Sequence, residues 1–239
     1  MTDLLYMEDS YLRGFEAKIV QLSEDGLRVY LDRTAFYPGG GGQPFDIGII
    51  KYKNQDYPVV KMGKDENKEI YHELAKPIHA KKEEKIVGTI DWDRRYKLMR
   101  THTALHILCG LIWKEFNASV TGGNMEIDKA RMDFNLEDFS KERVDYIQKR
   151  VNEEIDAGHE IKTRILSREE AFKIPDLIRT KINLLPAEIK EVRVVEIVDL
   201  DIQADGGTHL KSTKEVGKVV IVETINKGKE NKRMIIKIE

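Results

Sequence analysis

His102 and His106 are the side chains in this sequence whose type and spacing most directly predict chemistry. On a helix, residues four apart project from one face about one turn apart, so both imidazoles can bind the same metal ion. Thr103 follows His102 where zinc proteases carry a glutamate general base, which argues against that class of enzyme. Taken alone, a pair at this spacing is more often two unrelated histidines on a helix than a metal site.

A second group of this kind is Asp205-Gly206-Gly207-Thr208-His209. The two glycines let the backbone turn tightly, so the Asp205 carboxylate and the His209 imidazole can converge on one point. An ordinary Asp-Gly turn beside an exposed histidine is the alternative. Three of the six histidines fall into these two groups. The two groups together therefore indicate a metal site more strongly than either group does alone.

Cys109 follows His106 by three residues and would share its helix face. At 1.5 Å rise per residue it lies roughly 10 Å from His102 along the axis, too far for both to bind one ion at about 2 Å. With Leu108 and Leu111 beside it, Cys109 is predicted to be a small buried apolar residue.

Four consecutive glycines, Gly39, Gly40, Gly41 and Gly42, lie within the segment 34–44, which begins at Thr34 and continues past the glycines with Gln43. Consecutive glycines cannot stabilise a strand, but they permit unusual dihedrals and a close backbone approach to a ligand. The segment lacks the Gly-Lys-Ser/Thr of a Walker phosphate loop. A flexible connection in a barrel is the alternative.

The elements that would position these groups change character along the chain. Short strands separated by turns predict a small β-barrel in the N-terminal part, whereas helical spacing of apolar residues appears only later. The expected strands are residues 17–22, 27–31, 47–52 and 57–62, with turns at 23–26 and 53–56. Helices are expected at residues 95–116 and 140–157, and strands at 192–198, 217–222 and 233–238. We therefore expect an α+β fold in which a β-barrel domain, residues 1–90, precedes an α+β domain, residues 91–239.

The 239 residues are 41% hydrophobic and 34% charged, as in a soluble globular protein. No segment approaches the ~20 uninterrupted apolar residues of a membrane span. The single cysteine excludes an internal disulfide and fits a reducing cytoplasm.

The formal net charge is −2, so the chain as a whole is not a polycation. Nucleic-acid binding would therefore need a local basic face. Two segments could supply one: Lys81, Lys82, Lys85, Arg94, Arg95, Lys97 and Arg100, and later Lys227, Lys229, Lys232, Arg233 and Lys237. Solvated surface charge is the alternative for each segment.

Three ordered segments together resemble the AlaX family, the freestanding relatives of the alanyl-tRNA synthetase editing domain. Residues 34–44 are similar to the glycine-rich signature of that family, and residues 100–108 to its His-x-x-x-His helix. Residues 206–217 are similar to its Gly-Gly-Thr-His block with the trailing Thr-x-Glu-x-Gly. The glycine-rich segment and the absence of a long C-terminal extension match the medium-length type.

The resemblance implies an N-terminal barrel, an editing domain of the kind shared with threonyl-tRNA synthetase, and a role in translation fidelity. It implies hydrolysis of seryl-tRNA(Ala), with glycyl-tRNA(Ala) as a second candidate substrate. One divalent metal, zinc in the first instance, would be held by His102, His106, Asp205 and His209. The family usually carries cysteine where this chain has Asp205, so a hard oxygen replaces a soft sulfur and zinc is less assured.

Catalysis would rest on that metal, with Asp205 either completing its ligand set or acting as a base beside it. Selectivity needs a group that pairs with the serine hydroxyl, because a pocket that holds serine cannot exclude alanine by size. Thr121 is the first candidate, about where the family places a serine-sensing threonine, and Thr34 is the second. The substrate-binding set expected around the aminoacyl end is Thr34, Gly39, Gly40, Gly41, Gly42, Gln43 and Thr121.

Two other functions remain compatible with the same residues. A metal-dependent hydrolase of a small ester or amide would need the pocket but no RNA surface. A catalytically silent tRNA-binding module would use the metal only for structure, which Asp205 makes plausible. Steep salt dependence of tRNA binding would separate the RNA-binding functions from the small-substrate one.

Overall fold

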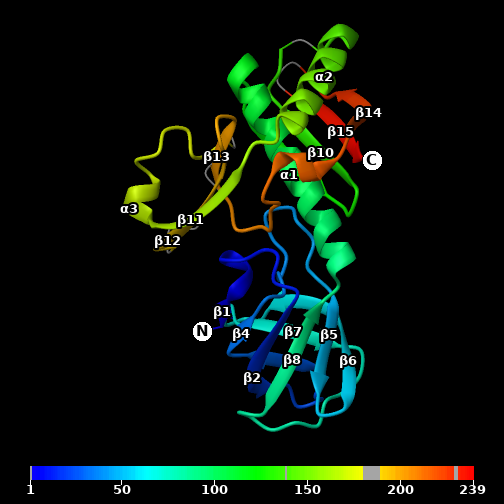
Figure 1. The fold of residues 1–239 in the computed structure, drawn as a ribbon, viewed down its shortest axis with the longest axis vertical. Coiled ribbons are helices and arrows are strands. Elements are labelled where there is room, and N and C mark those ends of the chain that lie inside the picture. The colour runs from blue at the N-terminus through cyan, green and yellow to red at the C-terminus, as the bar shows by residue number, and fades with distance from the viewer. Residues whose placement is uncertain (1, 138, 180–188, 229–230) are drawn as a thin grey trace. The chain divides into compact units, whose positions relative to one another are not determined.

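The computed structural model describes residues 2–137, 139–179, 189–228 and 231–239. These form two compact units, Met1–Tyr96 and Lys97–Glu239 (Figure 1). The first unit extends past residue 90 because the side chains of Arg94 and Arg95 bind to Phe45 and Asp46 of the barrel unit. The first turn of the following helix therefore belongs with the barrel.

The first unit contains a closed antiparallel barrel of six strands, as the spacing of turns predicts. Around the barrel the strands follow the order β2-β3-β7-β6-β5-β8. Their bounds are β2 Gly14–Leu22, β3 Arg28–Leu31, β5 Gly48–Tyr52, β6 Gln55–Lys64, β7 Ile70–Leu74 and β8 Lys85–Ile90. Outside the barrel, β1 (Asp3–Leu4) pairs in parallel with β4 (Arg33–Thr34), and a short 3₁₀ helix spans Leu5–Met7.

Alternating burial of side chains along the strands explains the barrel. In β2 and β8 every second side chain is buried, which places one face of each strand in the interior. The centre of this core includes Ile19, Val29, Leu31, Ile50 and Ile86, each at most 2% exposed. Burial of such side chains contributes roughly 1.5–3 kcal/mol each.

The hairpin between β5 and β6 is tighter than the sequence predicts. Tyr52 pairs with Gln55, so the turn has two residues rather than the four at 53–56. Lys53 has a φ of 53°, and positive φ is what a two-residue hairpin turn requires to match the twist of its strands.

The second unit combines two sheets with helices. A four-stranded sheet has the order β14-β15-β10-β9, and a three-stranded sheet has the order β11-β12-β13. The strand bounds are β9 Val120–Met125, β10 Lys129–Phe134, β11 Ile161–Ser167, β12 Glu191–Ile197, β13 Asp201–Ala204, β14 Val219–Asn226 and β15 Lys232–Ile238. The helices are α1 Trp92–Phe116, α2 Lys141–Ala157 and α3 Arg168–Ala171, with a 3₁₀ turn at Thr213–Val216.

α1 begins in the barrel unit and continues into the second. Residues 101–112 of this helix are buried on every side, so the helix is apolar around its circumference except where histidines and threonines lie. A buried histidine pair on such a helix needs partners, because an unpaired polar group in a protein interior is costly.

α2 follows its sequence signals closely. Ser140 caps the N-terminus by accepting a hydrogen bond from the Arg143 amide, and Gly158 ends the helix in the left-handed conformation at φ 71°. Ile147, Val151 and Ile155 form its buried stripe, as the helical spacing predicts.

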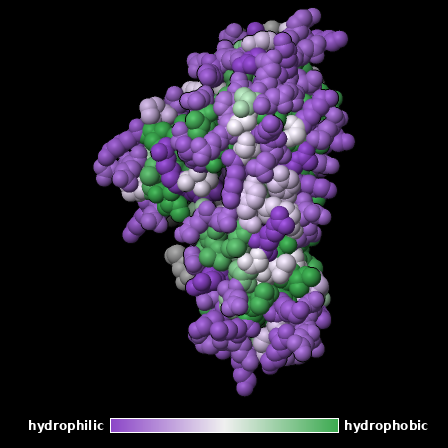
Figure 2. All heavy atoms as spheres, viewed as in Figure 1, coloured by the Kyte–Doolittle hydropathy of each residue, from purple (hydrophilic) through white to green (hydrophobic). Residues whose placement is uncertain are grey.

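No helix in the described part of the chain is long and apolar enough to cross a membrane. Hydrophilic residues cover most of the face drawn in Figure 2.

A candidate metal centre

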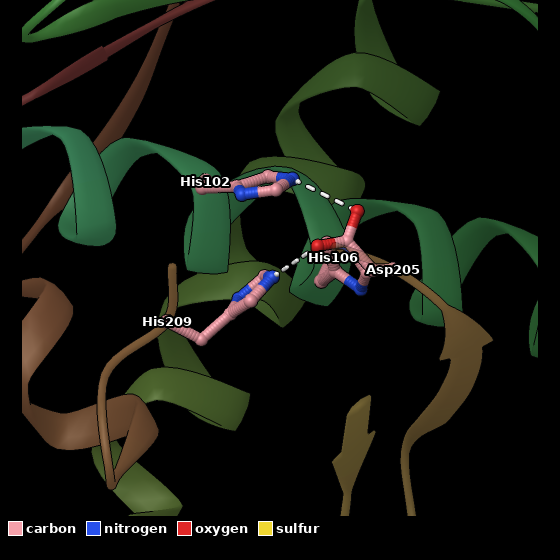
Figure 3. Close-up of side chains that lie close together, drawn as sticks. All are labelled: His102, His106, Asp205 and His209. Carbon is pink, nitrogen blue, oxygen red and sulfur yellow. Dashed lines mark hydrogen bonds and ion pairs between the residues drawn. The ribbon is translucent and has the colours of Figure 1, made fainter. Parts of the chain in front are cut away.

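His102 and His106 lie on the buried part of α1 with their ring centroids 5.1 Å apart. His209 comes from the loop after β13, and its ring centroid is 4.2 Å from that of His102 and 4.6 Å from that of His106. Figure 3 shows these three imidazoles and the Asp205 carboxylate gathered around a common centre. The structure therefore brings the two predicted groups together.

Arg193 of β12 holds the loop that carries Asp205. Its guanidinium donates to the carbonyl oxygens of Asp205 (3.2 Å) and Gly207 (2.7 Å), and its own carbonyl accepts from the Asp205 amide. Within the loop, Asp205 Oδ1 accepts a hydrogen bond from the Gly207 amide at 2.6 Å. These bonds fix the backbone from which the carboxylate projects.

The donor set fits a divalent metal. One ligand atom from each of His102, His106, Asp205 and His209 lies within 4.8 Å of the others. The Nε2 atoms of His102 and His106 are 3.6 and 3.9 Å from Asp205 Oδ2, and Nε2 of His209 is 3.1 Å from Oδ1. Four ligands at about 2 Å from one tetrahedral ion would be separated by about 3.3 Å. The distances from Asp205 to His102 and His209 are already near this value, and the longer separations in the cluster would have to shorten.

The protonation states of His102, His209 and Asp205 suit a metal. Burial lowers the pKa of His102 to about 4 and lowers that of His209 well below its usual value. Burial acts against the charge of Asp205, but the neighbouring imidazoles of His102 and His209 hold its pKa well below the ordinary value. Neutral imidazoles and an ionised carboxylate are the forms that bind metals.

Two residues that sequence reasoning missed orient the imidazoles. Asp201 Oδ2 lies 3.2 Å from His106 Nδ1, and the Thr103 hydroxyl lies 3.3 Å from His209 Nδ1. Burial acts to lower the pKa of His106, but the Asp201 hydrogen bond and the nearby carboxylates raise it overall. Metal-binding histidines commonly use their second ring nitrogen in this way, which is the signal that could have directed attention to Asp201.

Cys109 is 2% exposed, and burial raises the pKa of its thiol well above the usual value. It is not among the four clustered residues. The prediction of a small buried apolar residue is confirmed.

The glycine-rich segment of the barrel unit forms a defined turn. Gly40 and Gln43 exchange backbone hydrogen bonds of 3.1 and 2.9 Å, which makes Gly41 and Gly42 a two-residue hairpin tip. All four glycines have positive φ, between 56° and 140°, and Gly40 to Gly42 are exposed. A side chain at Gly41 would meet no atom within 4 Å, so the tip is open to approach.

Thr34 lies inside the barrel and is 0% exposed. His72 Nδ1 is 3.1 Å from the Val29 carbonyl, which can only accept, so Nε2 is the acceptor of the Thr34 hydroxyl at 2.8 Å. Burial lowers the pKa of His72 to about 4, consistent with a neutral ring. Thr34 Oγ1 also accepts from the Phe36 amide. Both hydrogen bonds of its hydroxyl are therefore made within the barrel unit, which argues against the predicted role in substrate binding.

Thr121 lies on β9 with an exposed side chain. Its hydroxyl donates to Asn231 Oδ1 at 3.3 Å. Of the two candidate threonines, it is the one that solvent and ligands can reach.

The two basic segments are only partly available to a partner. Arg95 is fully buried and Lys232 is 4% exposed, so neither forms part of a basic surface as predicted. Arg100 donates to the carbonyls of Val216 and Glu239. The exposed members among the described residues are Lys81, Lys82, Lys85, Lys97, Lys227 and Lys237. Lys229 lies outside the described residues.

Two family models and several named relatives match this chain. The family model for the threonyl and alanyl tRNA synthetase second additional domain matches residues 192–239, and that for class II (A) tRNA synthetases matches residues 10–94. The alanyl-tRNA editing protein AlaX-M of Saccharolobus solfataricus is 43% identical over 98% of both chains, and that of Methanosarcina acetivorans is 41% identical over the same shares. The alanine–tRNA ligase of Pyrococcus furiosus is 34% identical over 93% of this chain and 24% of the ligase. Full-length matches at this identity show that the chain belongs to the AlaX-M family of alanyl-tRNA editing proteins.

Proposed function

We propose that this protein hydrolyses the ester that joins serine to mischarged tRNA(Ala), using one divalent metal ion held by His102, His106, Asp205 and His209. The observation that carries the proposal is the convergence of these four side chains in a chain whose relatives are named alanyl-tRNA editing proteins. Glycyl-tRNA(Ala) is proposed as a second substrate. Zinc is proposed as the metal because three imidazoles and one carboxylate are among its usual ligands.

A divalent ion in this position supplies Lewis acidity toward an ester carbonyl and toward water. The three imidazoles contribute neutral nitrogen donors, and each is at most 6% exposed, so the chemistry would proceed away from bulk solvent. In a water-poor site, charge that develops on the ester is stabilised more strongly than in solution.

Asp205 has two roles open to it. Its two oxygens lie among all three imidazoles, which supports direct ligation. Its ionised carboxylate is also able to accept a proton at Oδ2 from an attacking water. We favour direct ligation because, among the described residues, Asp205 is the carboxylate that groups with all three imidazoles. Asp201 also contacts His106, but at Nδ1, the ring nitrogen on the other side.

Selectivity for serine is proposed to come from Thr121. Its exposed hydroxyl is able to exchange its bond to Asn231 for a bond to the substrate hydroxyl. Alanine would leave that partner without the substrate hydroxyl, which is how a hydrogen-bonding site rejects an analogue that lacks one. The exposed tip Gly40 to Gly42 is proposed to bind substrate, supported by its open backbone, whereas Gln43 beside it is 2% exposed.

The test is single-turnover deacylation of seryl-tRNA(Ala) by the metal-loaded protein, with alanyl-tRNA(Ala) as the matched control. Rapid release of serine and slow release of alanine are expected. Binding of tRNA(Ala) without turnover would instead indicate a silent binding module. Equal turnover of a small seryl ester, insensitive to salt, would indicate a small-ester hydrolase.

Asp205→Asn is expected to weaken zinc binding, because a neutral amide donates less charge than a carboxylate. The expected loss of affinity is at least ~10-fold, which is the loss seen when only an outer hydrogen-bonding partner of a metal ligand is removed. Asp205→Cys is expected to bind zinc more tightly than the wild type, since thiolate is the softer ligand. Metal titration of both variants checks this. Unchanged zinc affinity in Asp205→Asn would exclude the direct ligand and leave a site of three histidines.

Thr121→Val is expected to reduce the preference for seryl over alanyl ester by about 1–3 kcal/mol, the value of one hydrogen bond to a buried group. Valine keeps the shape and removes the hydroxyl, and the site is exposed, so stability should change little. The ratio of the two deacylation rates is the measurement. Thr224→Val, an exposed position on β14 of the same sheet, is the control and should leave the ratio intact. An equal ratio in both variants would show that Thr121 does not determine the preference for serine.

A further inference from the structure

Asp201 opens β13 and places its carboxylate against His106. The side chain is 1% exposed, and its Oδ2 lies 3.2 Å from His106 Nδ1. The opposite ring nitrogen, Nε2, is the one that lies 3.9 Å from Asp205 Oδ2 within the proposed metal centre. Asp201 thus contacts His106 on the side away from the metal.

The geometry defines where the proton of His106 lies. A carboxylate oxygen can only accept, so Nδ1 must carry the proton for a hydrogen bond to Asp201 to form. The Gln203 amide nitrogen donates to the same Asp201 oxygen at 2.6 Å. Its 3.4 Å contact with Nδ1 then joins two N–H groups and is not a hydrogen bond. In the neutral ring Nε2 then carries no proton, and it faces Asp205 in the proposed metal centre.

Alternation along β13 places the two residues on one side. Asp201 and Gln203 are two apart on the strand, whereas Ile202 and Ala204 pack against a separate apolar cluster that includes Val192 and Val194 of β12. A strand of this pattern presents its polar side to α1 and its apolar side to a core.

Arg179 holds the second oxygen of Asp201. Its Nε lies 3.5 Å from Oδ1, and its guanidinium stacks 4.7 Å from the Trp113 ring centre. With Gln203 and His106 on Oδ2, the carboxylate has donors at both oxygens. A carboxylate bound on both sides keeps one orientation.

Gly110 of α1 lets Asp201 lie close to the helix. This residue lies one turn after His106 in the interior of α1, where glycine costs about 1 kcal/mol relative to alanine. A β-carbon at this position would lie 2.7 Å from Asp201 Cβ and 2.9 Å from the Leu200 carbonyl oxygen. The helix therefore carries its glycine at the one turn where the start of β13 touches its backbone.

We propose that Asp201 is a positioning residue which fixes the His106 tautomer and ring orientation and thereby sets the affinity of the metal centre, with Gly110 providing the close approach. This inference rests on the metal centre of the proposed function. Outer partners of metal-binding histidines typically contribute 10- to 100-fold in affinity.

The first test is titration of the metal-free protein with Zn²⁺ against a chromophoric chelator. Asp201→Asn, which keeps the size of the side chain, is expected to raise the dissociation constant by about 10- to 100-fold. Asp199→Asn is the matched control: it removes one carboxylate two residues away, at an exposed position with a φ of 66° that asparagine adopts readily. Equal dissociation constants in the two variants, with both folded by circular dichroism, would overturn the proposal.

The second test needs no variant. The nitrogen-15 shifts of the imidazole rings in the metal-free wild type report which ring nitrogen of each histidine carries the proton. At a pH where the His106 ring is neutral, its proton is expected on Nδ1. A neutral ring with its proton on Nε2 would overturn the proposal even if Asp201→Asn failed to fold. A wild-type protein that binds no Zn²⁺ would contradict the proposed function, whereas normal wild-type binding with an unaffected Asp201→Asn would contradict only this inference.

Discussion

His209→Ala is expected to remove both metal binding and deacylation while the protein stays folded. The imidazole supplies one of four donors, and it comes from the loop rather than from α1, so its loss leaves no donor on that side except Asp205. Loss of Lewis acidity is worth several kcal/mol, which corresponds to at least about 10²- to 10³-fold in rate. His102→Ala and His106→Ala should act in the same direction.

Metal content by elemental analysis and single-turnover rates on seryl-tRNA(Ala) are the measurements. His79→Ala is the control, because this histidine is exposed on the barrel unit, and it should keep both metal and rate. Full activity with normal metal content in any of the three cluster variants would remove that histidine from the centre.

Arg95→Met is expected to destabilise the barrel unit by about 3–5 kcal/mol, the usual cost of leaving one charge of a buried pair unpaired. Arg95 and Asp46 are both fully buried, and Arg95 Nε lies 3.0 Å from both carboxylate oxygens. The same guanidinium donates to the carbonyls of Ser10 and Ala35. The substitution therefore removes the ion-pair partner of one buried carboxylate and the hydrogen-bond donor of two buried carbonyl groups.

Urea unfolding followed by tryptophan fluorescence and circular dichroism checks this expectation. Asp46→Asn added to Arg95→Met should recover part of the loss, because the residual buried charge disappears while an amide oxygen can still accept from the Tyr37 amide. Lys97→Met, an exposed position shortly after Arg95 on α1, should shift the midpoint little. An unfolding midpoint for Arg95→Met equal to that of Lys97→Met would show that the buried pair contributes nothing.

The features predicted from the sequence are those with local signals. The caps of α2 follow from Ser140 and Gly158, and the barrel follows from period-two strands separated by turns. His102 and His106 could be paired because helix geometry alone sets their spacing. The two glycines between Asp205 and His209 predicted a turn in that segment, although neither has a positive φ in the structure.

Residues whose roles depend on tertiary neighbours were not predicted. Nothing near Asp201 in the sequence indicates that it would meet His106 from 95 residues away. Arg95 was expected on a basic surface because its neighbours are basic, yet its partners come from three separate segments of the barrel unit. Long-range ion pairs of this kind follow no regular spacing along the sequence, so no sequence pattern predicts them.

The proposed ligands come from two short stretches of chain, and the contact between Thr103 and His209 spans 106 residues. A metal ion joining the two stretches would act as a cross-link that closes all the intervening chain into one loop. Closing a long loop removes much of the entropy of the unfolded state, and the free energy of binding then becomes free energy of folding. Metal supply would in that case govern how long this unit survives proteolysis as well as how fast it works.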